Sequence, residues 1–348
     1  MNYTIILSGG IGTRFWPLSR KSEPKQFLSI CSEKSMIEET MHRISILIKK
    51  KNIYIAANKM HKQKFKKCFK IFNLPLKNFF FEPQSKNTLA PIAVLSKIIR
   101  DLDKDAVVAV LPSDHFIKNN DRFIKLFAKG IQVAKRGYIV TLGIPPNKPE
   151  TGYGYIKINP KYKINSKIYK VDRFIEKPNI AKAKEFIKDK RYYWNSGIFI
   201  FKPDIFLEEI QKFMPKVYNI IMRMKNKKDC INLWSELPSI SIDYAIMERT
   251  NRAVVLPADC GWTDLGSWLA LVELMQKNKN GNVFQGECID IASKDTFVWS
   301  SNRLVATLGL KDIIVVETKD AILVCNKEKT QNVKNLVGLL NKKRKKYV

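Results

Sequence analysis

Histidine is scarce in this sequence of 348 residues, and closely spaced cysteine pairs are absent from it. Only three histidines occur, which excludes a histidine-rich metal site. The six cysteines are dispersed without a Cys-x-x-Cys pair, a distribution typical of reduced, packed thiols in a cytoplasmic protein. No apolar run is long enough to span a bilayer, and the first residues read as a strand rather than a signal peptide. We therefore expect a cytoplasmic globular protein with no membrane partner.

Acidic residues are few compared with basic ones. The 32 Asp and Glu are outnumbered by 62 Lys and Arg, which gives a formal net charge of +30. Such a charge suggests a nucleic-acid partner. However, the excess is spread along the chain and comes with no RNP signature, zinc-knuckle spacing or aromatic–basic repeat. We expect no nucleic-acid partner, although anionic substrates would be attracted. The basic run at 341–346 fits a solvated helix end, with contact to nucleic acid or anionic lipid as the alternative.

Short apolar strands alternate with helical patterns from residue 1 to residue 150. This alternation predicts an α/β fold with a mostly parallel, doubly wound sheet. We predict strands over 3–7, 53–57, 79–81, 107–111, 138–142, 153–158, 170–175, 198–201 and 253–256. We predict helices over 88–99, 123–134, 180–189, 204–213 and 242–249, and a further one that begins at a capping box, Ser35 to Glu38.

The pattern changes in the last part of the chain. Short β-rich runs recur at 288–291, 296–300, 304–308, 313–317 and 321–324, and a closing helix is predicted over 330–340. This spacing predicts a small all-β unit. Since the chain exceeds one average domain, we divide it into a catalytic domain, 1–278, and a small C-terminal domain, 279–348.

A glycine-rich segment follows the first predicted strand. It contains Gly9, Gly10 and Gly12, and four cations follow: Arg14, Arg20, Lys21 and Lys25. Glycines let backbone amides approach an anion closely, and cations neutralise it, as a triphosphate requires. The segment lacks the Gly-Lys-Ser/Thr of a P-loop, and Phe15 occupies the position where a dinucleotide fingerprint needs a small residue. The alternative is an ordinary turn after a strand.

Two aspartates, Asp114 and Asp264, each lie in a turn that follows a predicted strand. Carboxylate oxygens suit Mg²⁺, which takes one or two carboxylates and completes its shell with water and phosphates. We expect the two residues to form a magnesium site beside the triphosphate. The alternative is that each of them caps a helix.

Three further segments carry candidate substrate-binding groups. The Glu176–Lys177 pair ends a predicted strand and could hold a polyol and a phosphate, or be a surface charge pair. Gly154 and Asn195 lie among the small, aromatic and amide residues that line sugar pockets, although both segments also fit plain turns. Asn87 could read a base edge or cap the helix that follows it.

Together these segments resemble the mannose-1-phosphate guanylyltransferases (GDP-mannose pyrophosphorylases), a branch of the nucleotidyltransferases that activate sugar phosphates. The first motif runs from Leu7 to Arg20 and continues in Pro-Lys-Gln-Phe-Leu at 24–28. Further matching motifs lie at 111–115, 151–156, 174–178, 194–199, 241–248, 262–268 and 300–310, so the resemblance covers essentially the whole chain. Trp16, the segment 24–27 and the segment 300–310 point to the mannose branch.

The resemblance implies a Rossmann-like catalytic domain with a mixed, mostly parallel sheet and helices on both faces, a left-handed β-helix-like C-terminal domain, and a homodimer. It implies the reaction of GTP with α-D-mannose 1-phosphate to give GDP-mannose and diphosphate, with Mg²⁺ as cofactor. The implied nucleotide-binding residues are Leu7, Gly9, Gly10, Gly12, Thr13, Arg14, Lys25, Asn87, Ser113 and Asp114. The implied sugar-phosphate-binding residues are Gly154, Glu176, Lys177, Asn195 and Asp264. The implied catalytic residues are Arg14, Lys25, Asp114 and Asp264, of which the two aspartates bind the metal.

The sequence departs from the family pattern at two positions of the glycine-rich segment. Ile11 stands where a small residue is usual, and Phe15 replaces a usual leucine. The chain also stops where long bacterial members continue into an isomerase domain, so a fused isomerase activity is not expected. Two other functions remain open: the same chemistry on another pair, such as glucose 1-phosphate with UTP, and a non-catalytic regulatory subunit that senses GDP-mannose.

Overall fold

The computed structural model describes residues 1–165 and 167–348; the side chains of residues 67–70 and 165 lie outside the description, and with them the thiol of Cys68. By their contacts the residues form two compact units, each assembled from several segments. Unit 1 contains Met1–Gly9, Thr40–Ser113 and Ile117–Trp262, and unit 2 contains Gly10–Glu39, Asp114–Phe116 and Thr263–Val348. The domain boundary that we placed at 278/279 from the sequence stays a prediction.

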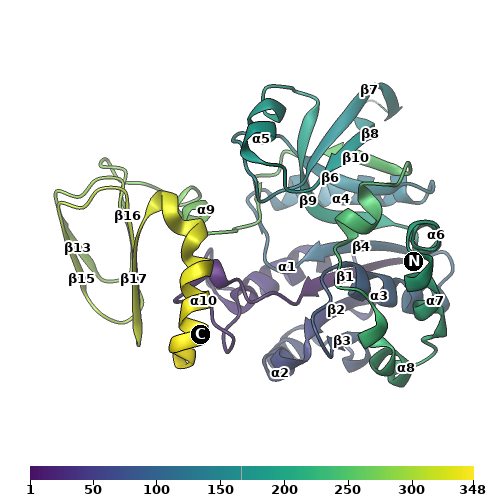
Figure 1. Ribbon diagram of the computed structural model, residues 1–348, viewed down its shortest axis with the longest axis horizontal. Coiled ribbons are helices and arrows are strands. Elements are labelled where there is room, and N and C mark those ends of the chain that lie inside the picture. The colour runs from purple at the N-terminus through teal and green to yellow at the C-terminus, as the bar shows by residue number, and fades with distance from the viewer. Residues whose placement is uncertain (166) are drawn as a thin grey trace. The chain divides into compact units, whose positions relative to one another are not determined.

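Unit 1 is built on a nine-stranded sheet in the order β3-β2-β1-β4-β9-β6-β10-β8-β7 (Figure 1). The strands are β1 (Asn2–Ser8), β2 (Ile53–Asn58), β3 (Phe79–Glu82), β4 (Val107–Pro112), β6 (Ile139–Ile144), β7 (Tyr155–Asn165), β8 (Ile168–Ile175), β9 (Tyr192–Phe201) and β10 (Ala253–Pro257). Strand β1 pairs in parallel with β2 and β4, and β6 pairs in parallel with β10. Strand β9 lies antiparallel between β4 and β6. The expected mixed sheet, with most strands running in one direction, is confirmed.

Helices cover both faces of this sheet. Neighbouring residues of β9 point to opposite faces, and each contacts a helix. Phe201 stacks on Phe206 of α6 with ring centroids 4.4 Å apart, whereas its neighbour Ile200 packs against Gly130 of α4. The helices of this unit are α2 (Lys62–Phe72), α3 (Leu89–Leu102), α4 (Asn120–Ala134), α5 (Ile180–Phe186), α6 (Pro203–Phe213), α7 (Pro215–Arg223) and α8 (Lys227–Asn232). Helix α1 (Met36–Ser45) and the short strands β5 (Phe116–Ile117) and β11 (Trp262–Thr263) each span the division between the units.

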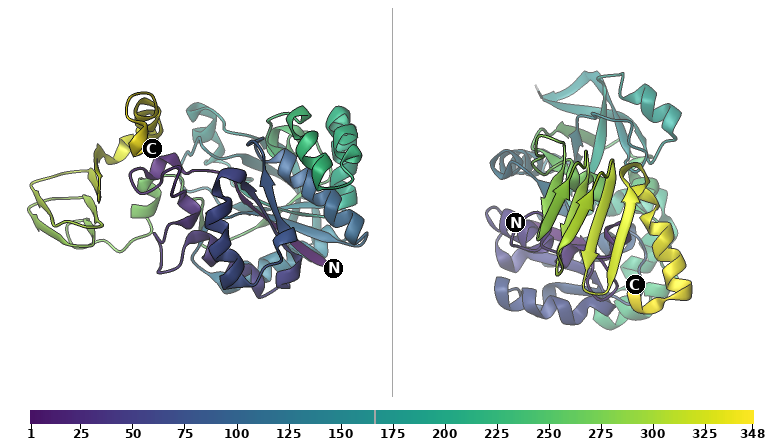
Figure 2. Two further views of the ribbon diagram at one scale, coloured as in Figure 1. Left: turned by 90° about the horizontal axis from the view of Figure 1, so that it is seen from below. Right: turned by 90° about the vertical axis from the view of Figure 1, so that its left-hand side faces the viewer.

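The C-terminal part of unit 2 is a β-helix-like stack. Its strands are β12 (Val283–Gln285), β13 (Cys288–Ile291), β14 (Phe297–Ser300), β15 (Val305–Leu308), β16 (Ile313–Thr318) and β17 (Ala321–Asn326). The chain alternates between a sheet of β12, β14, β16 and β17 and a sheet of β13 and β15. Figure 2 (right) shows these green to yellow strands side by side. Helices α9 (Trp268–Val272) and α10 (Val333–Lys343) complete the unit.

One apolar core joins the glycine-rich segment to this stack within unit 2. Phe15 lies 5.0 Å from Trp268, whose ring is 5.8 Å from that of Phe297. The indole nitrogen of Trp268 donates to the carbonyl of Trp16. The segment after β1 is therefore anchored by residues from the far end of the chain.

The predicted strands are all present, and several predicted elements differ in extent. Strand β7 runs from Tyr155 to Asn165, where 153–158 was predicted, and α5 ends at Phe186, where 189 was predicted. Strand β9 begins at Tyr192 instead of 198. The polar Asn195 and Ser196 interrupt the apolar pattern, but Asn195 still pairs with Gly143 of β6, and Trp194 pairs with Tyr155 of β7. The closing helix α10 begins at Val333, since 327–332 form a 3₁₀ segment. The segment predicted as a helix over 242–249 forms a π-helical turn, Asp243–Met247 (η7). The Glu38 carboxylate accepts from the amide and from the hydroxyl of Ser35, of which the first is one of the two hydrogen bonds of the predicted capping box.

Candidate active site

The glycine-rich segment of unit 2 adopts a conformation that requires glycine at position 12. Gly12 has a φ of 74°, in the left-handed region, and a Cβ there would lie 2.3 Å from the Cβ of Lys25. The amide of Phe15 donates to the Gly12 carbonyl, and the amide of Lys25 donates to the Ile11 carbonyl. A Cβ at Gly10 would meet no atom within 4 Å. The backbone at Gly10 is thus open to a ligand, while Gly12 lets Lys25 approach closely.

The four cations of this segment have different surroundings. Arg20 forms a bidentate ion pair with Asp320, and Lys21 donates to Asn341. Arg14 has a buried Nε with no hydrogen-bond partner among the described residues. Arg20 and Lys21 are thus engaged by protein groups, and the expectation that Arg14 and Lys25 contact the nucleotide phosphates stays a prediction.

Lys25 joins the two predicted metal ligands. Its Nζ donates to the Asp114 carboxylate at 2.9 Å, to the Asp114 carbonyl at 3.2 Å and to the Asp264 carbonyl at 2.7 Å. The Lys25 side chain is only 4% exposed, and its ammonium lies 5.4 Å from the centre of the Phe15 ring. Burial alone would raise the pKa of Asp114, but the charges of Lys25 and His115 outweigh it and lower that pKa. Asp114 is therefore a carboxylate at neutral pH.

Asp114 and Asp264 supply carboxylate oxygens of the kind that Mg²⁺ prefers, and magnesium binding by them stays a prediction. The Asp264 carboxylate accepts a hydrogen bond from the Gly266 amide at 2.8 Å, which fixes its orientation. No cluster of three or more His, Cys, Asp or Glu suited to a metal occurs among the described residues. Since Mg²⁺ commonly takes one or two carboxylates and completes its shell with substrate phosphates, a pair is sufficient.

The two departures from the family pattern have local partners in unit 2. Phe15 supplies an aromatic ring to the Lys25 ammonium, an attraction that a leucine would not provide. Ile11 lines a cavity of about 270 Å³ together with the apolar residues Trp16 and Val337. The same cavity is also lined by polar residues, among them Lys21 and Lys334, so Ile11 lies in a mixed environment.

Unit 1 brings together the residues predicted to receive the sugar phosphate. The Lys177 ammonium donates to the Glu176 carboxylate at 2.5 Å, and the backbone of Lys177 has a φ of 48°. A Cβ at Gly154 would lie 2.5 Å from the Glu176 carboxylate, so glycine makes room for that carboxylate. Burial opposes the charge of Lys177, but the hydrogen bond and charge of Glu176 and the charge of Asp243 raise its pKa.

Asn195 is the centre of a hydrogen-bond network in this group. Its amide nitrogen donates to Asp243 at 2.9 Å, and its amide oxygen accepts from Thr141 at 3.0 Å. Its backbone amide donates to the carbonyl of Gly154 at 2.8 Å. Burial raises the pKa of Asp243 to about 7, and the charge of Glu176 adds to the effect.

Sequence reasoning missed Asp243 and Glu248 as members of this group. The Glu248 carboxylate accepts from the backbone amide of Glu176 at 3.0 Å. The π-helical turn links the two residues, because the Glu248 amide donates to the Asp243 carbonyl. Both residues lie in the motif at 241–248, but nothing in their spacing indicates a contact with Glu176 or Asn195.

Aromatic rings lie next to this network. Tyr153 meets Trp194 edge-on with centroids 5.2 Å apart, and it meets Trp262 in the same way at 5.4 Å. Tyr153 precedes Gly154, and Trp194 precedes Asn195. A polyol that contacts Glu176 and Asn195 would find apolar ring surface beside them, as in sugar pockets generally.

The remaining nucleotide-binding candidates also lie in unit 1. The amide of Ser113 donates to the Leu7 carbonyl, and its hydroxyl donates to Ser8. Asn87 has a φ of 61°, and its side chain accepts from the amide of Thr88, directly before α3. This contact precedes the helix, whose N-cap residue is Thr88, so it is not a helix cap, and the expected contact of Asn87 with the base stays a prediction.

Glu82, which ends β3, was not among the predicted site residues. It is only 5% exposed, and its carboxylate lies 3.5 Å from the position that a Cβ of Gly9 would occupy. Burial raises the pKa of Glu82 to about 7, although the backbone amide of Lys86 works against this shift. The available signal was its position, since ligands bind at the carboxyl ends of such strands.

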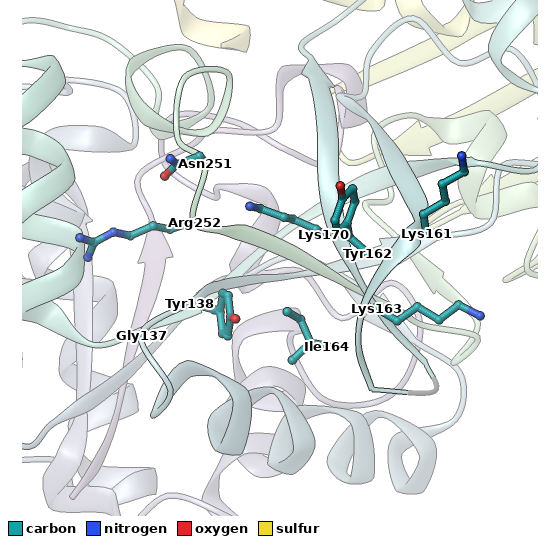
Figure 3. Close-up of a pocket in the computed structure, with 9 residues that line it drawn as sticks. All are labelled: Gly137, Tyr138, Lys161, Tyr162, Lys163, Ile164, Lys170, Asn251 and Arg252. Carbon is teal, nitrogen blue, oxygen red and sulfur yellow. The ribbon is translucent and has the colours of Figure 1, made fainter.

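A different cavity, of about 370 Å³, lies in unit 1 where β6 and β10 begin (Figure 3). It contains none of the candidate residues named above. Figure 3 shows Lys161, Lys163 and Arg252 directing their charged ends away from its centre. Arg252 is paired with Glu208 and Glu209. This cavity is therefore not the candidate active site.

Two family models match this chain. Residues 3–281 match the model of the nucleotidyl transferase family, and residues 286–340 match the mannoseP isomerase/GMP-like beta-helix domain. Among the described residues, no helix has the length and apolarity that crossing a membrane demands.

Relatives match along nearly the whole chain. The alginate biosynthesis protein AlgA of Pseudomonas syringae pv. tomato is 37% identical over 97% of this chain and 71% of its own length. Mannose-1-phosphate guanylyltransferase 2 of Escherichia coli O157:H7 is 36% identical over 97% of this chain and 73% of its own length. The xanthan biosynthesis protein XanB of Xanthomonas campestris is 39% identical over 96% of this chain and 72% of its own length.

A solved structure shares the architecture. The crystal structure of a Thermus thermophilus protein described as mannose-1-phosphate geranyltransferase superposes with a TM-score of 0.89 at 29% identity, covering 98% of this chain and 99% of that one. The resemblance drawn from the motifs is confirmed. The chain belongs to the nucleotidyl transferase family and carries the β-helix domain of its mannose-1-phosphate guanylyltransferase branch.

Proposed function

We propose that this protein is a mannose-1-phosphate guanylyltransferase, which converts GTP and α-D-mannose 1-phosphate into GDP-mannose and diphosphate. The observation that carries the proposal is the buried Lys25 ammonium, held between Asp114 and Asp264 beside the glycine-rich segment. The Escherichia coli relative, a mannose-1-phosphate guanylyltransferase at 36% identity, supports the choice of substrates.

The reaction needs positioning and charge neutralisation more than proton transfer. A phosphate oxygen of mannose 1-phosphate attacks the α-phosphorus of GTP, the bond from this phosphorus to the bridging oxygen breaks, and diphosphate leaves with the electron pair. The nucleophile is already anionic, so no general base is required. Arg14 and Lys25 would neutralise the nucleotide phosphates and Lys177 the attacking phosphate, while Glu176 and Asn195 would orient the sugar.

Asp114 and Asp264 would hold Mg²⁺. When bound, the metal supplies positive charge to the phosphates and helps to orient them. Lys25 contributes independently, because its ammonium is already fixed by three oxygen acceptors.

Glu82 would select guanine. A carboxylate can accept hydrogen bonds from both the N1–H and the 2-amino group of guanine, whereas adenine offers no such pair of donors. The Glu82 carboxylate lies in unit 1 close to Gly9, one of the predicted nucleotide-binding residues. The alternative substrate pair, UTP with glucose 1-phosphate, would present the uracil N3–H only.

The same proposal includes a homodimer located in the cytoplasm. The paired strands β13 and β15 expose Ile289, Ile291 and Leu308 at 57%, 64% and 72%, an apolar face that a second copy would cover. The five cysteines whose side chains are described are all free, in keeping with a reducing compartment. Light scattering on the wild type and on Ile291→Lys tests the dimer, and a monomeric wild type would contradict it.

The activity is tested by diphosphate release with Mg²⁺ across a panel of nucleoside triphosphates and sugar 1-phosphates. We expect the highest kcat/KM for GTP with mannose 1-phosphate. A preference for UTP with glucose 1-phosphate would favour the alternative enzyme. Binding of GDP-mannose without turnover of any pair would favour the regulatory subunit instead.

A further inference from the structure

Arg20 is held by three hydrogen bonds inside unit 2. Its two terminal nitrogens donate to the two carboxylate oxygens of Asp320 at 2.8 and 2.6 Å, and its Nε donates to the Pro17 carbonyl at 3.0 Å. The Arg20 side chain is 13% exposed and the Asp320 side chain 48% exposed. Bidentate pairs of this kind fix geometry as well as charge.

Asp320 lies in the tight turn between β16 and β17. The Thr318 hydroxyl closes this turn by donating to the Ala321 carbonyl at 2.9 Å. The Arg20 fork and the Thr318 hydroxyl together lower the pKa of Asp320, so it is a carboxylate at neutral pH. The turn between β16 and β17 thus binds the glycine-rich segment through the contact of Asp320 with Arg20, although these residues are 300 positions apart in the sequence.

Hydrogen bonds connect Arg20 and its neighbour Ser19 to the part of the segment that is predicted to bind the phosphates. Ser19, next to Arg20, donates its hydroxyl to the Gly12 carbonyl at 2.6 Å. Arg20 also exchanges backbone hydrogen bonds with Glu23, which sets the return of the chain to Lys25. The positions of Gly12 and Lys25 therefore both depend on where Arg20 is held.

Further contacts hold the same segment. Lys21 donates to Asn341 of α10 at 2.7 Å, and the Trp16 indole donates to the Tyr347 carbonyl at 2.8 Å. Figures 1 and 2 show the yellow helix α10 beside the purple segment that follows β1.

We propose that Asp320 is a positioning residue for the nucleotide: it holds Arg20, and through Ser19 and the Arg20–Glu23 turn it fixes the glycine segment that receives the triphosphate. The proposal deepens the proposed function and rests on it. It gives the β-helix domain a direct part in catalysis, because preorganised backbone groups and a fixed Lys25 determine how well the phosphates are aligned.

The test compares Asp320→Asn, which keeps the side-chain shape, with Arg20→Ala. Both variants should lower GTP affinity, measured by calorimetry without sugar phosphate, about 10-fold or more, since small displacements at such sites cost up to about 100-fold. The KM for mannose 1-phosphate should stay within about twofold, because Asp320 acts on the nucleotide segment only. The double variant should be no worse than Arg20→Ala alone, since Arg20→Ala already removes the contact with Asp320.

Hydrogen exchange provides a readout that does not depend on turnover. Backbone amides of residues 10–25 should exchange faster in Asp320→Asn, while peptides from β1 to β4 remain unchanged. The matched control is Glu208→Gln, which breaks another Arg–carboxylate contact, to Arg252 at 2.7 Å, with the carboxylate 54% exposed. It should change neither GTP affinity nor exchange in residues 10–25.

Two results would overturn the proposal. If Arg20 binds phosphate directly, Arg20→Ala will impair GTP binding, whereas Asp320→Asn will leave it unchanged or improve it. Unaltered exchange in residues 10–25 of Asp320→Asn would equally contradict it. Failure of the proposed function would look different: no substrate pair would turn over, while faster exchange in Asp320→Asn would still show that Asp320 holds the segment.

Discussion

Replacement of Asp243 by asparagine should change how the stability of the protein depends on pH. Asp243 ordinarily has a pKa of 3.8, and in the folded protein burial and the nearby charge of Glu176 raise it to about 7. The neutral carboxyl therefore favours the folded state. This stabilisation is fully present below the ordinary pKa and is lost as the pH rises through the folded-state pKa.

The size of the effect follows from the shift. One pKa unit corresponds to about 1.4 kcal/mol, so between pH 5 and pH 8 the ionisation of Asp243 removes about 3 kcal/mol of folding free energy. Asp243→Asn has no such ionisation, and its amide oxygen can still accept from Asn195. The free energy of unfolding of the variant relative to the wild type should therefore rise by about 3 kcal/mol from pH 5 to pH 8.

Urea unfolding followed by circular dichroism at several pH values measures this difference. Glu82, whose pKa burial also raises to about 7, titrates in both proteins, so its contribution cancels. Asp189→Asn is the control. The Arg191 hydrogen bond lowers the pKa of Asp189, so this substitution should alter the pH dependence of the free energy of unfolding only at acidic pH. A difference between Asp243→Asn and the wild type that stays constant from pH 5 to pH 8 would refute the reasoning.

Three further substitutions probe the site. Gly12→Ala places a Cβ 2.3 Å from that of Lys25 at a φ of 74°, so kcat/KM should fall about 100-fold or more with an unchanged circular dichroism spectrum; normal kinetics would contradict the assigned role of this backbone. Gly154→Ala places a Cβ 2.5 Å from the Glu176 carboxylate and should raise the KM for mannose 1-phosphate while leaving GTP binding intact, as titration calorimetry would show. Glu82→Gln should reduce the kcat/KM preference for GTP over ATP about 10-fold or more, and an unchanged preference would remove Glu82 from base selection.

Much of the fold could be predicted because its signals are local. The run from Tyr3 to Leu7 and the apolar run at 107–111 are short, continuous and bounded by turn residues, and they form the parallel pair β1 and β4. The short β-rich runs recur at a regular spacing, which is why the β-rich part could be recognised, and the runs at 288–291 and 304–308 form β13 and β15.

The parts that escaped prediction depend on contacts between distant residues. Arg20 and Lys21 look like phosphate ligands in sequence, since they follow the glycines closely, but long cationic side chains take the partner that the fold supplies, here Asp320 and Asn341. Asp243 was missed because its partner Asn195 lies 48 positions away.

Some of the predicted site residues contact one another in the structure. The Glu176–Lys177 pair and the Lys25–Asp114 pair are each found in direct contact. Asn87 accepts a hydrogen bond from the amide of its neighbour Thr88, a local contact that neither caps α3 nor tests base recognition.

The central claim is that Lys25, Asp114 and Asp264 form the centre of a guanylyl transfer site. It is tested most directly by measuring GDP-mannose formed from GTP and mannose 1-phosphate, by mass spectrometry, for the wild type and for Asp264→Asn. Asparagine can still accept the hydrogen bond from Gly266, so the local turn and the circular dichroism spectrum should be preserved. We expect the wild type to form GDP-mannose and Asp264→Asn to form almost none. Near-normal synthesis by the variant, or no synthesis by the wild type, would contradict the account.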